Sequence, residues 1–180
     1  TVLVLGGSQG ARSLNAAMLD ALPHLRGGRP VQVLHQAGPD HAEWVRARAA
    51  AIEAPRCVVL GYIEDVADAY AAADLVVCRA GAATIAEVTA NGLPAVLVPY
   101  PFAAGGHQDR NASLLGQQGA ALVIPDRELS GARLAEVIDA LRADDERRRA
   151  MAEASRRLGR PQAAAAVAEL AARAARRARA

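Results

Sequence analysis

The sequence predicts an α/β fold: a Rossmann-like, six-stranded parallel sheet with helices on both of its faces. Three observations support this prediction. Short apolar runs rich in valine, leucine and isoleucine occur six times, and such runs are typical of strands buried on both faces. A helical pattern follows each run after a short connection, which is how parallel strands are joined. The length of 180 residues suits one domain, or one domain with a helical appendage.

Turn-forming residues mark the ends of these elements, as Asn91-Gly92 does for the helix that follows the fourth strand. The expected strands are Val2–Leu5, Val31–His35, Cys57–Leu60, Leu75–Cys78, Pro94–Val98 and Ala120–Ile124. The expected helices run from about 11 to 25, from after Pro39 to about 51, from 66 to 72, from the turn at 79–81 to about 91, from 107 onward, and over about 130–142, 144–158 and 162–178. We therefore divide the chain into a domain over residues 1–160 and a helix rich in alanine and arginine over 161–180.

Charge and composition exclude several functions. All 21 basic residues are arginine, so a P-loop lysine, a kinase-type lysine and Schiff-base chemistry are absent, and a bound phosphate must be held by backbone N–H groups, hydroxyls or arginine. Aromatic residues make up only 3% of the chain, which argues against stacking platforms for single-stranded nucleic acid. Residues 142–180 carry 11 arginines against 5 acids, a balance that suits a solvated helix face more often than a nucleic-acid or membrane contact.

The cysteines, the histidines and the first residues further limit the kinds of protein that this chain can be. Cys57 and Cys78 lie on separate apolar runs, so we expect buried, reduced thiols. No two histidines stand at ligand spacing and no carboxylate cluster accompanies them, so a metal site is not expected. No apolar run reaches membrane-spanning length and no signal peptide is present. The chain begins at Thr1, directly in a strand and without a leading methionine, as expected of a piece of a larger protein.

The first strand ends in a loop of Gly6, Gly7, Ser8, Gln9 and Gly10. Glycines let the backbone approach a ligand closely, and the Ser8 hydroxyl lies beside the start of a helix. The loop is not a G-x-G-x-x-G sequence, which disfavours an NAD site. It does match the G-x-S-x-G nucleophile elbow of hydrolases, with Ser8, Asp74 and His107 as the triad. That elbow normally follows several strands, and none precedes it here, so the hydrolase interpretation is less favoured.

A second strand-to-helix turn follows Leu75–Cys78. Thr84 and Glu87 stand three residues apart, the spacing of a capping box at a helix start. Glu87 is therefore either a helix cap or a ligand-binding carboxylate, and the spacing alone does not decide between them. In a parallel sheet the carboxyl ends of all strands share one edge. Polar or glycine-rich segments gather there: Ser8, His35-Gln36, Tyr62-Ile63, Arg79–Glu87 and His107-Gln108.

These residue types suit a nucleotide or a sugar nucleotide. A carboxylate at Glu87 accepts two hydrogen bonds from a vicinal diol such as ribose, and a backbone strip at Ile63 can read the edge of a base. Gln108 offers both an acceptor and a donor, as sugar hydroxyls require. A diphosphate would lie near the glycine loop and the helix starts. The residues alone therefore predict a nucleotide- or sugar-nucleotide-binding α/β domain.

Five motifs occur together, in order, over roughly residues 1–142: VLVLGGSQGAR, HQAG, GYIEDVADAYAAADLVVCRAGAATIAEV, GLPAVLVPYPFAAGGHQDRNA and GAALVI. Together they resemble the C-terminal half of the MurG family of UDP-N-acetylglucosamine transferases. The resemblance implies the C-terminal domain of a GT-B glycosyltransferase, which binds the donor UDP-N-acetylglucosamine. It also implies that the substrate is a UDP-sugar rather than a cofactor.

Carried over by position, the resemblance implies a role for each motif. Ser8 and the phosphate loop of Gly6, Gly7 and Gly10 would meet the diphosphate, and Ile63 would meet the uracil through its backbone. The segment Ala82, Ala83, Thr84, Ile85, Ala86 and Glu87 would pack against phosphate and ribose. Gln108, with His107 beside it, would bind the sugar hydroxyls, although some members have a second glutamine at the His107 position. No catalytic residue is expected in this chain, because the family's presumed base lies in the N-terminal domain.

The resemblance also implies the setting of the whole protein. The family transfers N-acetylglucosamine to lipid I with inversion, giving lipid II in peptidoglycan synthesis. The expected partners are an N-terminal acceptor domain and, through it, lipid I, without nucleic acid. The expected location is cytoplasmic and peripheral, on the inner face of the bacterial plasma membrane. The last helix would return toward the N-terminal domain.

Three alternatives remain open at this point. Two are enzymes of the same two-domain type: another UDP-sugar transferase and a UDP-N-acetylglucosamine 2-epimerase. The third is a non-catalytic nucleotide-binding or interaction module with a basic tail.

Overall fold

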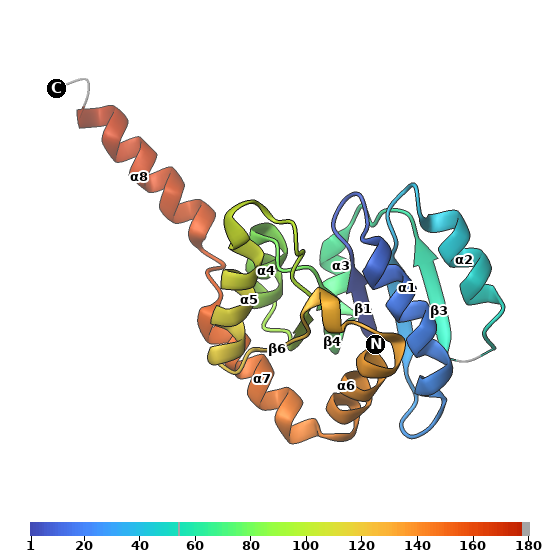
Figure 1. The fold of residues 1–180 in the computed structure, drawn as a ribbon. Coiled ribbons are helices and arrows are strands. Elements are labelled where there is room, and N and C mark those ends of the chain that lie inside the picture. The colour runs from blue at the N-terminus through green and yellow to red at the C-terminus, as the bar shows by residue number, and fades with distance from the viewer. Residues whose placement is uncertain (54, 178–180) are drawn as a thin grey trace.

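A computed structural model describes residues 1–53 and 55–177, and in this part of the chain six parallel strands form one sheet. The strand order is β3-β2-β1-β4-β5-β6, so the predicted fold class is confirmed (Figure 1). The strands are β1 (Val2–Leu5), β2 (Gln32–Gln36), β3 (Arg56–Leu60), β4 (Leu75–Cys78), β5 (Ala95–Leu97) and β6 (Ala121–Val123). Two strands coincide with the prediction, and the other four differ from it by one residue at one or both ends.

The helices follow the predicted order with short 3₁₀ turns between them. They are α1 (Arg12–Ala21), η1 (Leu22–Arg26), α2 (Ala42–Ala50), α3 (Val66–Ala71), α4 (Ala82–Ala90), η2 (Ala104–Gly106), α5 (His107–Gln117), η3 (Asp126–Glu128), α6 (Gly131–Ala143), α7 (Asp145–Leu158) and α8 (Ala163–Arg177). The expected helix over 11–25 is divided after Ala21, because Pro23 lacks an N–H and cannot continue the α-helical ladder. Residue 178, the expected end of the last helix, lies outside the described residues.

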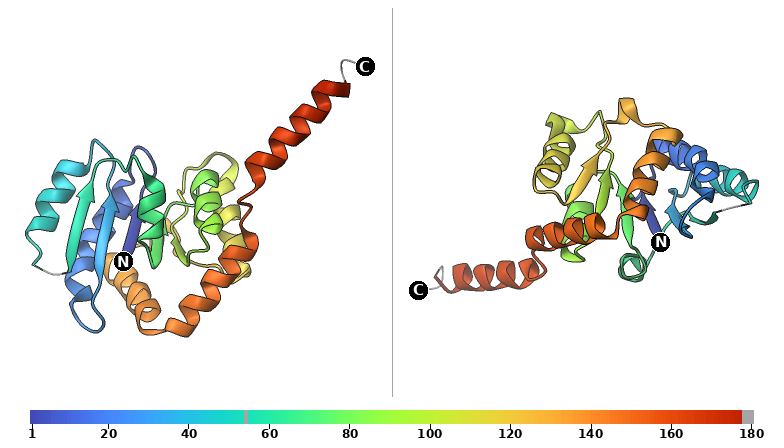
Figure 2. Two further views of the ribbon diagram at one scale, coloured as in Figure 1. Left: turned by 180° about the vertical axis from the view of Figure 1, so that it is seen from behind. Right: turned by 90° about the horizontal axis from the view of Figure 1, so that it is seen from below.

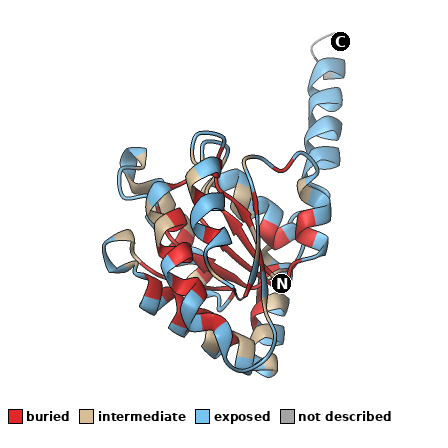
Figure 3. Ribbon diagram, turned by 90° about the vertical axis from the view of Figure 1, so that its right-hand side faces the viewer, coloured by how far each residue is buried: buried red, intermediate tan, exposed pale blue. Residues whose placement is uncertain are grey.

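Residues that alternate along the strands belong to two hydrophobic cores, one on each face of the sheet. Buried residues, red in Figure 3, are concentrated in the strands and in the helices that cover them. Val2 and Val4 pack with residues of α1, α2 and α6, whereas Leu3 and Leu5 pack with residues of α3, α4 and α5. Because helices cover both faces of the sheet, the two central strands, β1 and β4, are apolar at every position.

The strand order places a topological switch point between β1 and β4. From β1 the chain proceeds to β2 and β3 on one side, and it then crosses to β4 on the other side. The loops that follow β1 and β4 consequently diverge and leave a crevice at the carboxyl edge of the sheet, where ligands bind in open α/β sheets.

The last helix projects away from the rest of the molecule (Figures 1 and 2). Residues 161–176 are all exposed, including Val167 at 66% and Leu170 at 61%. Among the described residues, neither hydrophobic core contains a residue of α8. No helix in that part of the chain is both long and apolar enough to cross a bilayer.

Candidate functional site

Two neighbouring clefts open at the carboxyl edge of the sheet. The larger cleft, of about 810 Å³, lies between the β1 loop, the start of α1 and the loop that follows β5. The smaller cleft, of about 370 Å³, lies between the β1 loop, the segment after β3 and α4. Gly7 and Thr84 line both clefts, so the two hollows meet where the β1 loop faces α4. Together they form one crevice at the switch point.

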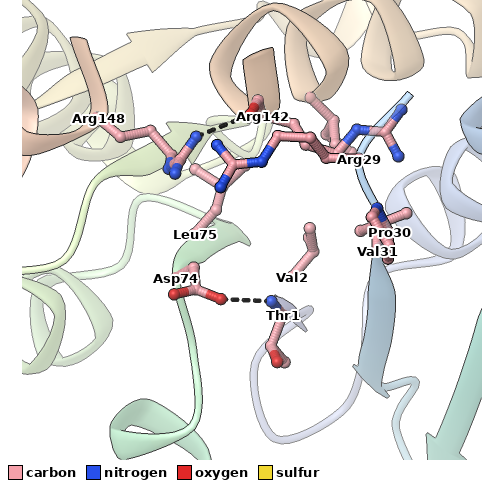
Figure 4. Close-up of a pocket in the computed structure, with 10 residues that line it drawn as sticks. Thr1, Val2, Arg29, Pro30, Val31, Asp74, Leu75, Arg142 and Arg148 are labelled. Atoms are coloured by element: carbon pink, nitrogen blue, oxygen red, sulfur yellow. Dashed lines mark hydrogen bonds and ion pairs between the residues drawn. The ribbon is translucent and has the colours of Figure 1, made fainter. Parts of the chain in front are cut away.

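A third, smaller hollow of about 160 Å³ lies at the opposite edge of the sheet (Figure 4). Its arginines are occupied by protein groups: Arg142 donates to Leu25 O at 3.1 Å, and Arg148 donates to Arg142 O at 3.0 Å. Asp74 pairs there with the amino group of Thr1 at 2.5 Å. Asp74 precedes β4 whereas Ser8 follows β1, so the two lie at opposite ends of parallel strands and the hydrolase triad is excluded.

The β1 loop is held by the loop after β2. Gly10 adopts a φ of +76°, and a Cβ there would lie 1.9 Å from the carbonyl oxygen of Ala37. A Cβ on Gly38 would lie 2.3 Å from the carbonyl oxygen of Gln9. Gln36 adds a hydrogen bond from Nε2 to Gly7 O at 3.1 Å. The backbone of this loop is therefore fixed before any ligand arrives.

Two helices begin at the crevice without a capping side chain. The N-cap of α1 is Ala11 and that of α4 is Gly81, and neither makes a side-chain cap hydrogen bond. Neither first turn contains an acidic residue. Free N–H groups and the positive ends of both helix dipoles thus face the region between the clefts, an arrangement that favours an anion.

The capping box predicted for Thr84 and Glu87 is wrong. The N-cap of α4 is Gly81 rather than Thr84, so Glu87 lies too far along the helix to reach its first N–H groups. Glu87 instead accepts a hydrogen bond from the hydroxyl of Tyr70 at 2.8 Å. The interpretation of Glu87 as a helix cap is therefore excluded, and its interpretation as a ligand-binding carboxylate stays a prediction.

The predicted segment of α4 is divided between two surfaces. Ala83, Thr84 and Glu87 line the smaller cleft together with Ser8 and Ile63. The other three residues of the segment line a separate hollow near the end of α7: Ala82, Ile85 and Ala86. Only one face of this helix therefore presents side chains to the crevice.

The amide of Gln108 has a defined orientation on the wall of the larger cleft. Its Oε1 accepts hydrogen bonds from Ala80 N at 3.1 Å and Tyr100 N at 2.9 Å. This network leaves Nε2 to donate, so the expectation that Gln108 offers both an acceptor and a donor is corrected to a donor. His107 is exposed, and its Nδ1 donates to Ala104 O at 2.7 Å, which leaves Nε2 free.

Arg79 is a candidate functional residue for which the sequence analysis predicted no role of its own, since it named Arg79 only as the first residue of the segment Arg79–Glu87. It is 9% exposed and donates to Asp126 Oδ1 at 2.6 Å, to Ser13 Oγ at 2.7 Å and to Val98 O at 3.1 Å. Its guanidinium also lies 5.6 Å from the ring centroid of Tyr100. Arg79 thus ties the ends of three strands to α1. An arginine directly after a fully apolar strand was the available signal.

His35, expected at the site edge, is a core residue instead. Its side chain is fully buried and its Nε2 donates to Asn15 Oδ1 at 2.9 Å, while Asn15 Nδ2 donates to Ala37 O at 2.8 Å. Burial lowers the pKa of His35 to about 4, so the imidazole is neutral near pH 7. Side chains on β2 alternate between the two faces of the sheet, and that of His35 points into the core, which its position at the end of a predicted strand did not reveal.

The structure also bears on two other kinds of chemistry, metal binding and nucleophilic attack by a thiol. In the described part of the chain, no three His, Cys, Asp or Glu side chains are arranged to hold a metal ion. Both cysteines are free, and burial raises the pKa of Cys57 to about 11 and that of Cys78 to about 12. Neither thiol is therefore activated as a nucleophile.

The strand order, the switch-point crevice and the uncapped helix starts define a Rossmann-type α/β domain whose crevice suits an anionic ligand. The model of the glycosyltransferase family 28 C-terminal domain matches residues 1–171, and the chain belongs to this family.

Individual relatives agree with this assignment. The chain is 50% identical over 170 residues to the UDP-N-acetylglucosamine–N-acetylmuramyl-(pentapeptide) pyrophosphoryl-undecaprenol N-acetylglucosamine transferase of Nitrosococcus oceani, covering 93% of this chain and 46% of the relative. It is 48% identical over 179 residues to the protein of that name from an Anaeromyxobacter species, covering 98% and 46%. The chain thus spans about half the length of the curated relatives it matches.

Solved structures show the same fold. The crystal structure of Acinetobacter baumannii MurG superposes with a TM-score of 0.85 and 36% identity, covering 94% of this chain and 48% of that one. The resemblance to the C-terminal half of MurG is therefore confirmed. A co-structure of S. aureus MnaA with UDP has a TM-score of 0.68 at 12% identity, covering 93% of this chain and 44% of that one, a likeness in fold alone.

Proposed function

We propose that this chain is the donor-binding half of an inverting glycosyltransferase that moves N-acetylglucosamine from UDP-N-acetylglucosamine to lipid I, giving lipid II. The observation that carries the proposal is the crevice itself: two uncapped helix starts lie between a carboxylate on one side and an amide donor on the other. The names of the half-matching relatives support the choice of donor and acceptor.

The crevice suits the parts of the donor in order. The uracil and ribose belong in the smaller cleft, where Ile63 offers its backbone and Glu87 its carboxylate. The diphosphate belongs at the junction, near Gly7, Ser8 and the N–H groups that begin α4. The sugar belongs in the larger cleft, where Gln108 Nε2 donates to a hydroxyl oxygen.

The chemistry assigned to this half is stabilisation of the leaving group. An acceptor hydroxyl attacks the anomeric carbon, the bond to UDP breaks in line, and negative charge grows on the leaving diphosphate. Backbone N–H groups and helix dipoles fixed at the junction stabilise that charge, and no ammonium group is required. The base that takes the proton of the acceptor is assigned to the N-terminal half, so this chain alone should bind donor without turnover.

The remaining assignments concern the whole protein. We infer that the domain covers residues 1–160, and that α8, in the remaining segment predicted as a helix, is directed to an N-terminal acceptor domain, which brings in lipid I. The protein would act on the cytoplasmic face of the bacterial plasma membrane as a peripheral enzyme. No cofactor or nucleic-acid partner is part of the proposal.

Calorimetry tests the proposal with UDP and UDP-N-acetylglucosamine on the 180-residue chain. Glu87→Ala should weaken the binding of both ligands, whereas Glu153→Ala, on an exposed position of α7, should leave it unchanged. A folded wild-type chain that binds neither ligand, or equal binding by Glu87→Ala, would contradict the proposal. A competition series of UDP-sugars distinguishes the proposed transferase from another UDP-sugar transferase or a UDP-N-acetylglucosamine 2-epimerase. A salt-dependent gel shift with DNA that is lost when residues 160–180 are deleted would instead favour a non-catalytic interaction module with a basic tail.

A further inference from the structure

Glu87 is exposed on the surface of α4, yet its carboxylate is hydrogen-bonded to a residue of the hydrophobic core. Tyr70, on α3, is only 2% exposed, and its ring is part of the hydrophobic core on that face of the sheet. Its hydroxyl reaches the smaller cleft and donates to Glu87 Oε2 at 2.8 Å. A rigid, buried side chain thus determines the position of a flexible, exposed one.

We propose that Tyr70 is a positioning residue, which orients the carboxylate of Glu87 toward the two hydroxyls of a nucleotide ribose. The inference deepens the proposed function and rests on it, because it takes the smaller cleft as the ribose site. In this proposal Tyr70 acts on the ligand through Glu87.

The hydrogen-bonding capacity of the carboxylate fits this role. An ionised carboxylate has about four acceptor positions on its two oxygens, and Tyr70 uses one of them. Oε1 and the second lone pair of Oε2 remain for a vicinal diol. A free glutamate on a helix surface samples several rotamers, and fixing one of them on binding costs entropy. Because the Tyr70 hydroxyl selects a rotamer in advance, that cost falls.

The hydroxyl remains a donor under all ordinary conditions. Burial and the neighbouring Glu87 carboxylate raise the pKa of Tyr70, so the phenol stays protonated. Cys78, also beneath the cleft, is buried with its own pKa raised and stays neutral.

Tyr70→Phe provides a clean test, because it removes the hydroxyl and keeps the ring in the core. Glu87 is exposed, so losing its partner leaves no buried group without a hydrogen bond, and the fold should persist. Calorimetry on the 180-residue chain should show UDP binding weakened about fivefold. Binding of 2′-deoxy-UDP should change less, so the preference for ribose over deoxyribose should fall. Added to Glu87→Ala, the substitution should have no further effect.

Ser113→Ala is the control, since it removes an exposed hydroxyl on α5 that lines neither cleft of the crevice and does not contact Glu87. Its ribose preference should equal that of the wild type. If Glu87→Ala loses UDP affinity while Tyr70→Phe keeps both affinity and preference, the inference is overturned and the proposed function stands. Equal weakening of UDP and 2′-deoxy-UDP by Tyr70→Phe would indicate a general structural role and also overturn it. If Glu87→Ala binds UDP normally, the ribose assignment and this inference fail together.

Discussion

Individual residues of the crevice are held by charge and hydrogen bonds that cross between elements. Arg79 shows this most clearly, because its partners lie on α1, after β5 and after β6. With Asp126 and Ser13 it closes a small network at one wall of the larger cleft, in which Ser13 Oγ also donates to Asp126 Oδ1 at 2.8 Å. Such a buried pair is costly to break, since removing one partner leaves the other charge unpaired.

Arg79→Met should therefore destabilise the protein by about 3 kcal/mol. Urea unfolding gives the free energy directly. Arg133→Met is the matched control, because Arg133 pairs with Glu136 at an exposed helix position and should contribute about 0.5 kcal/mol or less. Similar losses in the two variants would show that the Arg79 network contributes little.

The buried His35 makes stability depend on pH. Its pKa is about 4 in the folded chain against 6.5 for a free side chain, so below pH 6.5 the unfolded chain binds a proton that the folded chain refuses. This contribution is complete above pH 6.5 and is lost as the pH falls toward 4, by about 3 kcal/mol in all. The difference in unfolding free energy between the wild type and His35→Gln should change by that amount between pH 7 and pH 4.

Among the elements, the interlocked loops after β1 and β2 determine the shape of the diphosphate region. Their glycines are required for two separate reasons: the backbone is left-handed at Gly10, and Ala37 leaves no room for a Cβ there. A position under only one of these constraints could relax to accept a side chain, whereas the position of Gly10 is under both.

Gly10→Ala should accordingly destabilise the protein by about 2 kcal/mol or more and abolish measurable UDP binding. Gly27→Ala is the control, because Gly27 has an ordinary φ and nothing lies within 4 Å of its Cβ position. Thermal unfolding and calorimetry on both variants check the prediction. An unchanged Gly10→Ala would mean that the two loops separate easily.

The sequence predicted elements better than it predicted contacts. β1 and β4 were placed correctly because continuous apolar runs bounded by small residues have one simple interpretation. The start of α4 directly after the turn at 79–81 was also placed correctly, but the capping interpretation of Thr84 and Glu87 was wrong, because the pattern matched by chance and the true N-cap, Gly81, has no side chain to signal it. Tyr70 and Asp126 were missed because their roles depend on partners distant in sequence, which no local pattern encodes.

At the scale of the whole molecule, the compact body and the projecting α8 are distinct. The core on each face of the sheet is complete without α8, whereas α7 contributes Met151 and Ala154. Stability should therefore come from the part of the chain that ends with α7.

A chain ended at residue 160 should keep its unfolding free energy within about 0.5 kcal/mol and its affinity for UDP. Ending the chain at residue 143 removes α7 as well and should destabilise it strongly, because Met151 and Ala154 leave the two cores. Urea unfolding of both truncated chains makes the comparison. A clear loss on ending at 160 would mean that α8 supports the body.

The central place of β1 also affects how the chain folds. β1 must pair with β4, as in Val2 with Leu75, across a long intervening segment, and closing so large a loop is slow. Until that step is complete, the turn after β1 and the turn after β4 do not face each other, and neither hollow exists. During refolding, nucleotide affinity should then return with the slowest phase, well after most of the helical signal has recovered.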